Sequence, residues 1–296
     1  MKNFVYFNGK FIPRPQAHIS INDHGFLYGF GLFETMRTYH GKIFLLDRHI
    51  KRLLDAAEAI GIAEKIAGTD LEKACVETVK VNGIDEARVR LTITNGENAA
   101  LPWMDAGGPP TVLVTAIPYT PYTPQKYEQG LKVGVAASVR RTRESILSSI
   151  KSINYLLNVM ARMETARRGL DEALVLNEDG YLAEGGSSNV FFVRSGRLVT
   201  PALNSGILPG ITREVVMEIA AGLGIGLSEG TVGKAVFKQC DEAFMTNSLI
   251  EIMPVTKISD ESGQSVTIGE GKPGEITRRL TQAYRERVDK EVMSSE

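Results

Sequence analysis

Lys151 is the side chain best suited to covalent chemistry. It lies between two isoleucines, just before an apolar series at helical spacing formed by Leu156, Val159, Met160, Met163 and Ala166. Partial desolvation lowers the pKa of an amine and makes it a usable nucleophile. These residues alone favour a simpler interpretation, in which the stem of Lys151 lies on apolar surface and its ammonium reaches water. Other segments must decide between the two.

A second chemical feature is a glycine-containing turn that leads into a helix-like run. It reads Leu208-Pro209-Gly210-Ile211-Thr212-Arg213-Glu214. The backbone N–H groups and the dipole at the start of a helix attract anions, and phosphate is a natural occupant. Taken alone, the turn is explained more simply by Thr212 acting as the N-cap of the helix.

Two charged side chains could complete a site. Glu184 precedes Gly185 and Gly186, and glycines allow a backbone to approach a ligand closely. Arg52 lies on an expected helix that begins at Asp47, where it could bind a phosphate. In isolation, a solvated glutamate in a turn and an exposed arginine remain the simpler interpretations.

Hairpins and short helices are expected in the first part of the chain. They are hairpins around Asn8-Gly9 and His40-Gly41, a helix from Asp47 to Gly61, a helix from the capping-box pattern Thr69–Glu72 to about Gly83, and strands 87–94 and 111–117. Strand 87–94 places Val89 and Leu91 on one face and Arg88 and Arg90 on the other. One face of this sheet must therefore be polar.

Residues 95–110 form an expected loop that contains Trp103 and Met104. This apolar pair is equally consistent with a lid over a site and with a plug under the loop. Prolines at positions 118, 121 and 124 then favour an extended linker. The expected domains are 1–118 and 131–296, joined by the linker 119–130.

The second half mixes strands and helices. The expected strands are 133–139, 172–177, 189–193, 242–246 and 252–258, and the expected helices are one that follows Lys151 and runs to Gly169, 212–223, 231–238 and one beyond Gly274. Hairpins alternate with helices in this order. The sequence therefore predicts a mixed α/β (α+β) fold rather than a doubly wound sheet.

Composition narrows the class of protein. The 296 residues carry a formal net charge of -1, and 43% are hydrophobic. We therefore expect no nucleic acid or membrane partner, and no apolar run is long enough for a transmembrane helix. The two cysteines, Cys75 and Cys240, are far apart and favour a reducing cytoplasm. No strong metal-binding or phosphate-loop motif is present, so no metal site is expected.

An activated lysine, a helix start ready for phosphate, an arginine and a carboxylate are together what a pyridoxal 5'-phosphate site needs. The chain also resembles the class IV aminotransferases, which are fold type IV pyridoxal phosphate enzymes. Seven blocks carry the resemblance: Asp23-His24-Gly25-Phe26-Leu27-Tyr28-Gly29, Phe33-Glu34-Thr35, His49-Ile50-Lys51-Arg52-Leu53, Lys151-Ser152-Ile153-Asn154-Tyr155, Tyr181-Leu182-Ala183-Glu184-Gly185, Leu208-Pro209-Gly210-Ile211-Thr212-Arg213 and Met245-Thr246-Asn247-Ser248. They occur in the order of the family and span nearly the whole chain.

The resemblance implies roles for individual residues. Lys151 would form the Schiff base with the cofactor and carry the proton, and Glu184 would hold the pyridine nitrogen. The phosphate would be bound by Arg52, Ile211, Thr212 and Ser248, with Asn247 beside them, and Tyr155 would lie near the ring hydroxyl. Tyr28, Phe33 and Arg90 would line the substrate pocket. The resemblance also implies a two-domain fold and a homodimer.

Three activities within the family remain open. Branched-chain aminotransferases usually have glycine at the position of Thr35, and D-amino-acid aminotransferases usually carry an arginine and a histidine near 95–98, which are missing here. The blocks 33–35, 87–91 and 245–248 look like those of bacterial aminodeoxychorismate lyases. We therefore expect a lyase of the folate pathway, with a transaminase as the alternative. A non-catalytic relative that only binds a ligand would be expected to lack Lys151.

Overall fold

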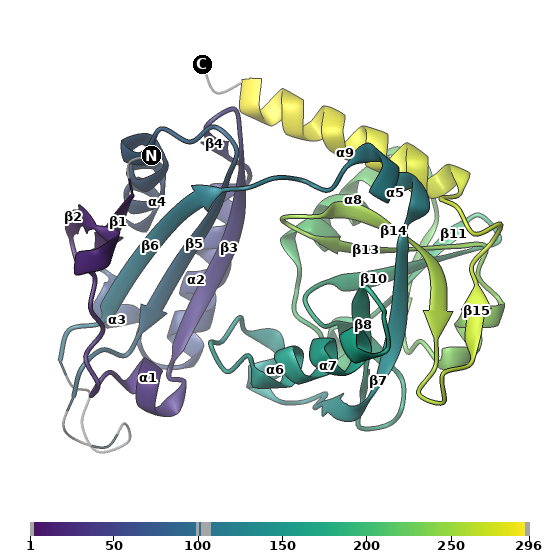
Figure 1. The fold of residues 1–296 in the computed structure, drawn as a ribbon, viewed down its shortest axis with the longest axis horizontal. Coiled ribbons are helices and arrows are strands. Elements are labelled where there is room, and N and C mark those ends of the chain that lie inside the picture. Colours follow the sequence, from purple (N-terminus) through teal and green to yellow (C-terminus); the bar gives the residue numbers. More distant parts are fainter. Residues whose placement is uncertain (1–2, 99–100, 102–107, 294–296) are drawn as a thin grey trace. The chain divides into compact units, whose positions relative to one another are not determined.

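The computed structural model describes residues 3–98, 101 and 108–293, which form two compact units (Figure 1). Unit 1 comprises Met1–Thr120, Ile150–Asn154 and Lys290–Glu296, and unit 2 comprises Pro121–Ser149 and Tyr155–Asp289. The expected boundaries assign Lys151 to the second domain. In the structure, Lys151 belongs to unit 1, together with the rest of the segment Ile150–Asn154.

Unit 1 is built on an antiparallel sheet. Its described strands, in spatial order, are β2 (Lys10–Pro13), β1 (Phe4–Phe7), β6 (Thr111–Pro118), β5 (Ala87–Thr94), β3 (Gly31–Tyr39) and β4 (Lys42–Ile43). The expected hairpin turns are confirmed, because Asn8-Gly9 and His40-Gly41 all have positive φ angles. Two successive positive φ angles are typical of the tight turns that suit twisted hairpins.

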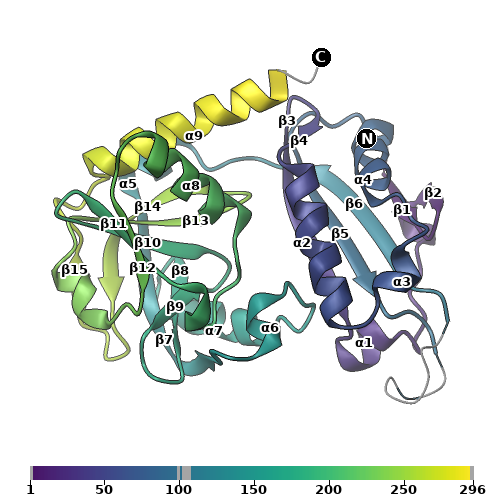
Figure 2. The same ribbon diagram turned by 180° about the vertical axis from the view of Figure 1, so that it is seen from behind.

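Helices cover one face of this sheet. They are α2 (Leu46–Ala59), α3 (Ala63–Ile66) and α4 (Leu71–Asn82), while the short helix α1 (His24–Tyr28) precedes β3. Figure 2 shows α2 in front of the sheet, and buried residues such as Leu53, Val79 and Leu91 share one core between helices and sheet. On strand β5, Arg88 and Arg90 alternate with this core and are exposed. The expected polar face is therefore confirmed.

Unit 2 is built on a mixed sheet. Its described strands run in the spatial order β12 (Leu227–Gly230), β11 (Arg197–Pro201), β10 (Asn189–Arg194), β13 (Glu242–Asn247), β14 (Glu251–Ser259), β7 (Leu131–Arg141), β8 (Glu172–Asn177) and β9 (Leu182–Gly185), with β15 (Ser265–Thr267) beside β14. The β14–β7, β7–β8 and β11–β12 pairs are parallel, and the others are antiparallel. The mixed α/β class expected from the sequence is confirmed.

The helices of unit 2 differ from expectation, because a helix lies within 119–130, which was expected as an extended linker, and a short helix at 146–149 was not expected. They are α5 (Pro124–Gln129), α6 (Ile146–Ser149), α7 (Leu156–Arg167), α8 (Ile211–Gly222) and α9 (Glu275–Met293), whose last residues belong to unit 1. The expected helix 231–238 is wrong: only a 3-10 turn at Lys234–Lys238 forms, because Val232 makes a β-bridge with Leu182. The N-cap of α8 is Gly210, so Thr212 lies inside the helix and does not cap it.

The expected loop 95–110 is described only in part, and Trp103 and Met104 lie outside the described residues. In the described part of the chain, no helix combines the length and apolar character needed to cross a membrane.

The N-cap of α4 yields a test of stability. Its side-chain cap is Asp70, which accepts a hydrogen bond from the backbone N–H of Lys73 at 2.9 Å, and not Thr69 as the capping-box pattern suggested. We expect Asp70→Ala to lower the free energy of unfolding by about 1 kcal/mol in urea denaturation. Thr69→Ala is the matched control and should have little effect. Equal losses in the two variants would contradict this assignment.

Candidate functional site

Lys151 lies in an extended segment that pairs with the edge of β3. The backbone N–H of Phe33 donates to the carbonyl oxygen of Lys151 at 2.9 Å, and the N–H of Ile153 donates to the carbonyl of Gly31 at 3.1 Å. Ser152 is therefore opposite Leu32, and Ile150 joins the core of unit 1. The lysine is thus fixed by backbone hydrogen bonds and not by the helix that follows it.

Lys151 and Phe33 share one face of the sheet. The Nζ atom of Lys151 lies 4.7 Å from the centre of the Phe33 ring, and the guanidinium carbon of Arg90 lies 3.8 Å from the same centre. Thr35 follows on that face and is directly opposite Arg90 in the strand register. A hydroxyl, an aromatic ring and two cations are therefore gathered on one surface. Such a surface suits an aromatic or carboxylate-bearing molecule.

Arg52 lies on α2 and is held by Glu34 of β3. Its Nε donates to Oε1 of Glu34 at 2.8 Å, and its Nη2 donates to Oε2 at 2.7 Å. The Nδ1 of His49 is 2.8 Å from the same Oε2. Burial would raise the pKa of Glu34, but Arg52 and His49 lower it to about 2. The carboxylate is therefore ionised at neutral pH.

His49 is neutral in this arrangement. Burial lowers its pKa, and although Glu34 opposes that effect, the positive charges of Arg52 and Lys151 add to it. The ring therefore contributes a hydrogen bond without a charge. The charges of both predicted residues, Arg52 and Lys151, therefore favour the neutral form of this ring.

Tyr28 is the last residue of α1 and is about half exposed. Its ring lies edge-on to His24, with 5.4 Å between ring centres. Gly29 follows with a φ of +67°, and a side chain there would collide with Asn154, whose Nδ2 donates to the carbonyl of Gly29 at 2.9 Å. This contact ties Tyr28 to the segment that carries Lys151.

Glu184 lies in unit 2 on β9 and is buried. One carboxylate oxygen accepts a hydrogen bond from Nη2 of Arg141, and the other accepts from the backbone N–H of Leu208 at 2.9 Å. The carboxylate is thereby tied to the turn that leads into α8. A buried, oriented carboxylate of this kind can hold a proton on a basic ring nitrogen.

The start of α8 is adjacent to this carboxylate. Its N-cap, Gly210, has no side chain to accept from the first N–H groups of the helix, and Ile211 and Thr212 are both buried. A side chain at Gly210 would collide with Asn189, whose Nδ2 donates to the carbonyl of Leu208 at 3.0 Å. The turn is thus packed closely against β10. Backbone N–H groups at a helix start without a side-chain cap can bind phosphate.

Asn247 and Ser248 lie where β13 ends. Asn247 Oδ1 accepts from the backbone N–H groups of Leu249 and Ile250, both at 2.9 Å, and its Nδ2 donates to the carbonyl of Ser187 at 3.0 Å. The side chain of Asn247 therefore shapes the turn that presents Ser248. Strand β13 pairs with β10, and β10 contacts Gly210 through Asn189. The turn that presents Ser248 therefore follows the strand beside β10.

Tyr155 precedes α7 and donates from its hydroxyl to the carbonyl of Gly186 at 3.3 Å. Burial raises its pKa to about 12, and the negative charges of Glu184 and Glu172 add to this effect. The phenol therefore keeps its proton at neutral pH. Asn158 donates to the same carbonyl at 2.9 Å, so the glycine loop after Glu184 is fixed by two side chains.

The predicted site residues thus form two groups, one in each unit. The group in unit 1 contains Tyr28, Phe33, Arg52, Arg90 and Lys151, and the group in unit 2 contains Tyr155, Glu184, Ile211, Thr212, Asn247 and Ser248. Sequence reasoning assigned no role to Glu34, His49 or Arg141. Glu34 and His49 lie within quoted blocks, but only the contact between β3 and α2 reveals their bond to Arg52. For Arg141, no sequence signal points to Glu184.

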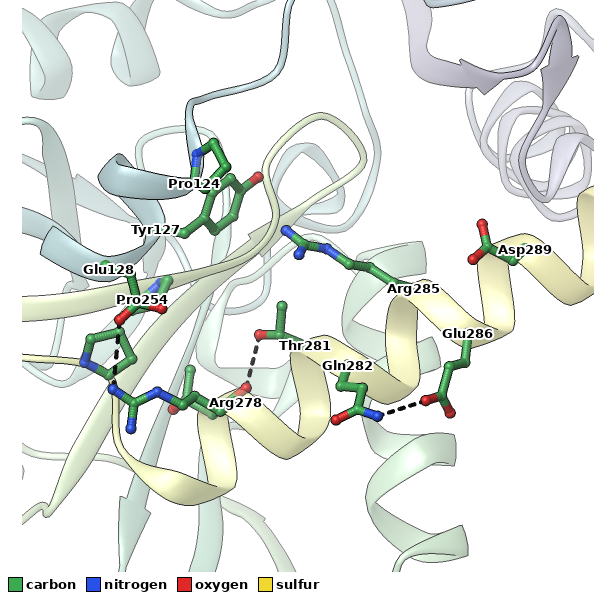
Figure 3. Close-up of a pocket in the computed structure, with 12 residues that line it drawn as sticks. Pro124, Tyr127, Glu128, Pro254, Arg278, Thr281, Gln282, Arg285, Glu286 and Asp289 are labelled. Carbon is green, nitrogen blue, oxygen red and sulfur yellow. Dashed lines mark hydrogen bonds and ion pairs between the residues drawn. The ribbon is translucent and has the colours of Figure 1, made fainter.

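A groove on unit 2 lies apart from both groups. It has a volume of about 360 Å³ and runs between α5, Pro254 and α9 (Figure 3). Its arginines have acidic partners. Nη2 of Arg278 lies 3.6 Å from Oε2 of Glu128, and Nε of Arg285 lies 3.3 Å from Oε2 of Glu251. None of the predicted site residues lines it. We therefore do not assign it a role in catalysis.

Comparisons with known proteins agree on one family. The family described as Amino-transferase class IV matches residues 31–258. A putative branched-chain-amino-acid aminotransferase of Methanocaldococcus jannaschii is 35% identical over 289 residues, which cover 95% of each chain. The aminodeoxychorismate lyase of Bacillus subtilis is 35% identical over 289 residues, which cover 96% of this chain and 94% of the relative.

A solved structure supports the same family. The T.th. branched-chain amino acid aminotransferase with pyridoxamine 5'-phosphate matches this chain with a TM-score of 0.86 and 29% identity. The match covers 97% of this chain and 94% of that chain. The similarity therefore extends through both units and is not confined to one motif.

The buried carboxylate of Glu34 should make stability depend on pH. Its pKa in the folded protein is about 2, below the ordinary 4.5, so its stabilising contribution is present above pH 4.5 and is lost as the pH falls toward 2. In urea denaturation between pH 4.5 and about 3, we expect the natural protein to lose up to about 1.4 kcal/mol more per pH unit than Glu34→Gln.

Glu86→Gln is a control for this experiment, because Glu86 pairs with Arg37 of β3 but is partly exposed. Its pH profile should stay closer to that of the natural protein. Parallel profiles for the natural protein and Glu34→Gln would contradict the lowered pKa of Glu34.

Proposed function

Because the chain belongs to the class IV aminotransferases, which are pyridoxal phosphate enzymes, we propose that it is a 4-amino-4-deoxychorismate lyase. Pyridoxal 5'-phosphate is its cofactor, and the chain is an enzyme. The lyase activity is supported by the similarity to the Bacillus subtilis enzyme and by the hydroxyl of Thr35 on the face of Lys151 and Phe33.

The residues present fit this cofactor. Besides Glu184 and the open start of α8, unit 2 has two buried hydroxyls without a hydrogen-bond partner in the described residues, Oγ of Ser188 and Oγ1 of Thr246. Thr246 is opposite Asn189 in the strand register, directly beside the turn at Gly210. Unsatisfied buried polar groups are costly unless a ligand or water completes them. A polar cofactor would do so.

The residues predicted to bind the cofactor each have a proposed role. Lys151 would bond to the cofactor and would move the proton at the reacting carbon, and Glu184 would hold a proton on the pyridine nitrogen. Arg52, the backbone of Ile211 and Thr212, and Ser248 bind the phosphate. Asn247 holds the turn of Ser248, and Tyr155 lies near the ring hydroxyl. The bound cofactor supplies the electron withdrawal that makes the reaction possible.

The proposed reaction is an elimination. The amine of Lys151 removes the proton from the amine-bearing carbon of the substrate ring, and the bond from the neighbouring carbon to the enolpyruvyl oxygen breaks. The ring becomes aromatic, which drives the step and gives 4-aminobenzoate and enolpyruvate. The enolpyruvate takes up a proton on its methylene carbon to become pyruvate. Arg90, stacked on Phe33, is placed to bind a substrate carboxylate, and Tyr28 lines the same pocket.

A transaminase is the second candidate. It is favoured by the Methanocaldococcus jannaschii relative and the solved T.th. structure, both of which carry branched-chain aminotransferase names. In that case Lys151 would return the proton to the cofactor, and hydrolysis by water would release a 2-oxo acid. A branched-chain L-amino acid or a D-amino acid would be the donor, and 2-oxoglutarate the acceptor.

We also propose that the enzyme is a homodimer. Helix α7 exposes apolar side chains that are three or four residues apart and therefore share one face. Their exposed fractions are 70% for Leu156, 43% for Val159, 45% for Met160 and 49% for Met163. Such a stripe on the surface of a helix is typical of a protein interface. The proposed occupant is a second copy of the chain.

A reducing cytoplasm is the proposed location. Cys75 and Cys240 are both free and buried, and burial raises their pKa values to about 12 and about 11. Thiols of this kind are unreactive and need no disulfide partner. Recovery of the enzyme in a membrane or secreted fraction of its own cells would contradict this location.

Product analysis distinguishes the two activities. We expect the holoenzyme to convert aminodeoxychorismate into 4-aminobenzoate and pyruvate without any amino acceptor, and Lys151→Ala to lose this activity. In parallel reactions, L-leucine or D-alanine is supplied with 2-oxoglutarate, and glutamate is measured. Glutamate formation without 4-aminobenzoate would replace the lyase by the transaminase.

The dimer can be tested with a charge on α7. Met160→Asp should shift the protein toward monomer in size-exclusion chromatography with light scattering, because burying the carboxylate at an interface is costly. Met293→Asp, at an exposed methionine of α9, is the matched control and should remain dimeric. A Met160→Asp variant that stays fully dimeric would exclude the α7 stripe as the interface.

A further inference from the structure

Glu34 is a carboxylate in a place where the fold needs only an apolar side chain. It is completely buried and lies on the face of β3 that carries Leu32 and Met36, both part of the core. Burying an ion pair rarely stabilises a fold more than apolar side chains of the same volume would. The retention of a charge here calls for a role other than stability.

The contacts of Glu34 fix one side chain in particular. Both of its oxygens accept from Arg52, through Nε at 2.8 Å and Nη2 at 2.7 Å. Two parallel hydrogen bonds define the plane of a guanidinium as well as its position. The direction of the remaining Nη1 group is therefore set by the carboxylate.

His49 restricts the carboxylate in turn. It lies three residues before Arg52 on α2, so the two side chains are on the same face of the helix. Its Nδ1 is 2.8 Å from Oε2 of Glu34, which accepts hydrogen bonds from both residues. The ring is buried as well. Rotation of the carboxylate would therefore break hydrogen bonds to two partners at once.

We propose that Glu34, braced by His49, is a positioning residue that orients Arg52 toward the phosphate of the cofactor. This inference rests on the proposed role of Arg52 as a phosphate ligand. Glu34 does not touch the cofactor. It holds the arginine in a binding geometry before the cofactor arrives, which reduces the ordering that binding would otherwise require.

Charge and geometry make opposite contributions here. The negative charge of Glu34 weakens the attraction of Arg52 for a phosphate, whereas its two hydrogen bonds fix the arginine. Glu34→Asp separates these effects, because it keeps the charge and shortens the side chain by one methylene. If orientation dominates, this variant must bind the cofactor less tightly.

The test is a cofactor titration of the full-length apoprotein, followed by visible absorbance. Glu34→Asp should weaken the affinity for pyridoxal 5'-phosphate about tenfold, as expected for a lost oriented charge-assisted contact. Pyridoxal, which has no phosphate, should bind both proteins equally. Glu86→Asp, which alters the partner of Arg37 of β3, should leave both affinities unchanged.

A double-mutant cycle with Arg52→Lys identifies the route of the effect. Lysine keeps a positive charge beside Glu34 but cannot form the two parallel hydrogen bonds. The weakening caused by Glu34→Asp should therefore largely disappear in the Arg52→Lys background. Urea denaturation of all four proteins checks that each is folded at the titration temperature.

The outcomes separate the inference from the proposed function. Weaker binding in Arg52→Lys together with unchanged binding in Glu34→Asp would overturn the positioning role alone. Unchanged binding both in Arg52→Lys and in the double variant Arg52→Ala with Glu34→Gln would overturn the phosphate role of Arg52. Equal losses for pyridoxal and its phosphate would show a general structural effect, which also contradicts the inference.

Discussion

Two backbone hydrogen bonds between β3 and the segment 150–154 fix the lysine on which the proposed chemistry depends. They join Phe33 to Lys151 and Gly31 to Ile153, and they make five residues from the middle of the chain part of unit 1. Because the backbone of this segment is already ordered, little conformational entropy is lost when the lysine side chain reacts. The position of Lys151 therefore follows from the register of one strand pair and not from its own sequence neighbours.

The candidate residues of the two units are of different kinds. Unit 1 supplies cations and an aromatic ring on a sheet, with Arg52 held by a buried carboxylate on the opposite face. Unit 2 supplies a buried carboxylate, a phenol and the start of a helix. Some of these side chains are oriented by a partner, as Glu34 orients Arg52 and Arg141 orients Glu184. The similarity to known relatives extends over nearly the whole chain and so includes both units.

Local signals in the sequence predicted the elements that depend on local physics. Asn8-Gly9 fixes a tight turn, and Gly83 ends α4 in the left-handed conformation, because only a few residue types tolerate those backbone angles. Contacts between distant residues were not predictable in this way. Periodicity could not show that Glu34 reaches Arg52, or that a β-bridge at Val232 would replace a helix with a short turn. These outcomes depend on tertiary pairing, which a local pattern does not encode.

The apolar series after Lys151 also shows what a local sequence pattern does not predict. Its spacing correctly predicted a helix, but Leu156 and Met160 are exposed and do not line the core of the chain. Helical periodicity reports that one face is apolar and does not say what covers it. The resemblance to a family assigned roles to the candidate residues, and the structure adds the side chains that hold them.

Mapping the lysine that bonds to the cofactor tests this account most directly. Borohydride makes that bond permanent, and a modified Lys151 blocks tryptic cleavage, so the peptide spanning residues 144–162 should carry one phosphopyridoxyl group. The account predicts this modification at Lys151 and at no other lysine. A holoenzyme that carries the group on a different lysine, or that keeps its cofactor with Lys151 unmodified, would contradict it.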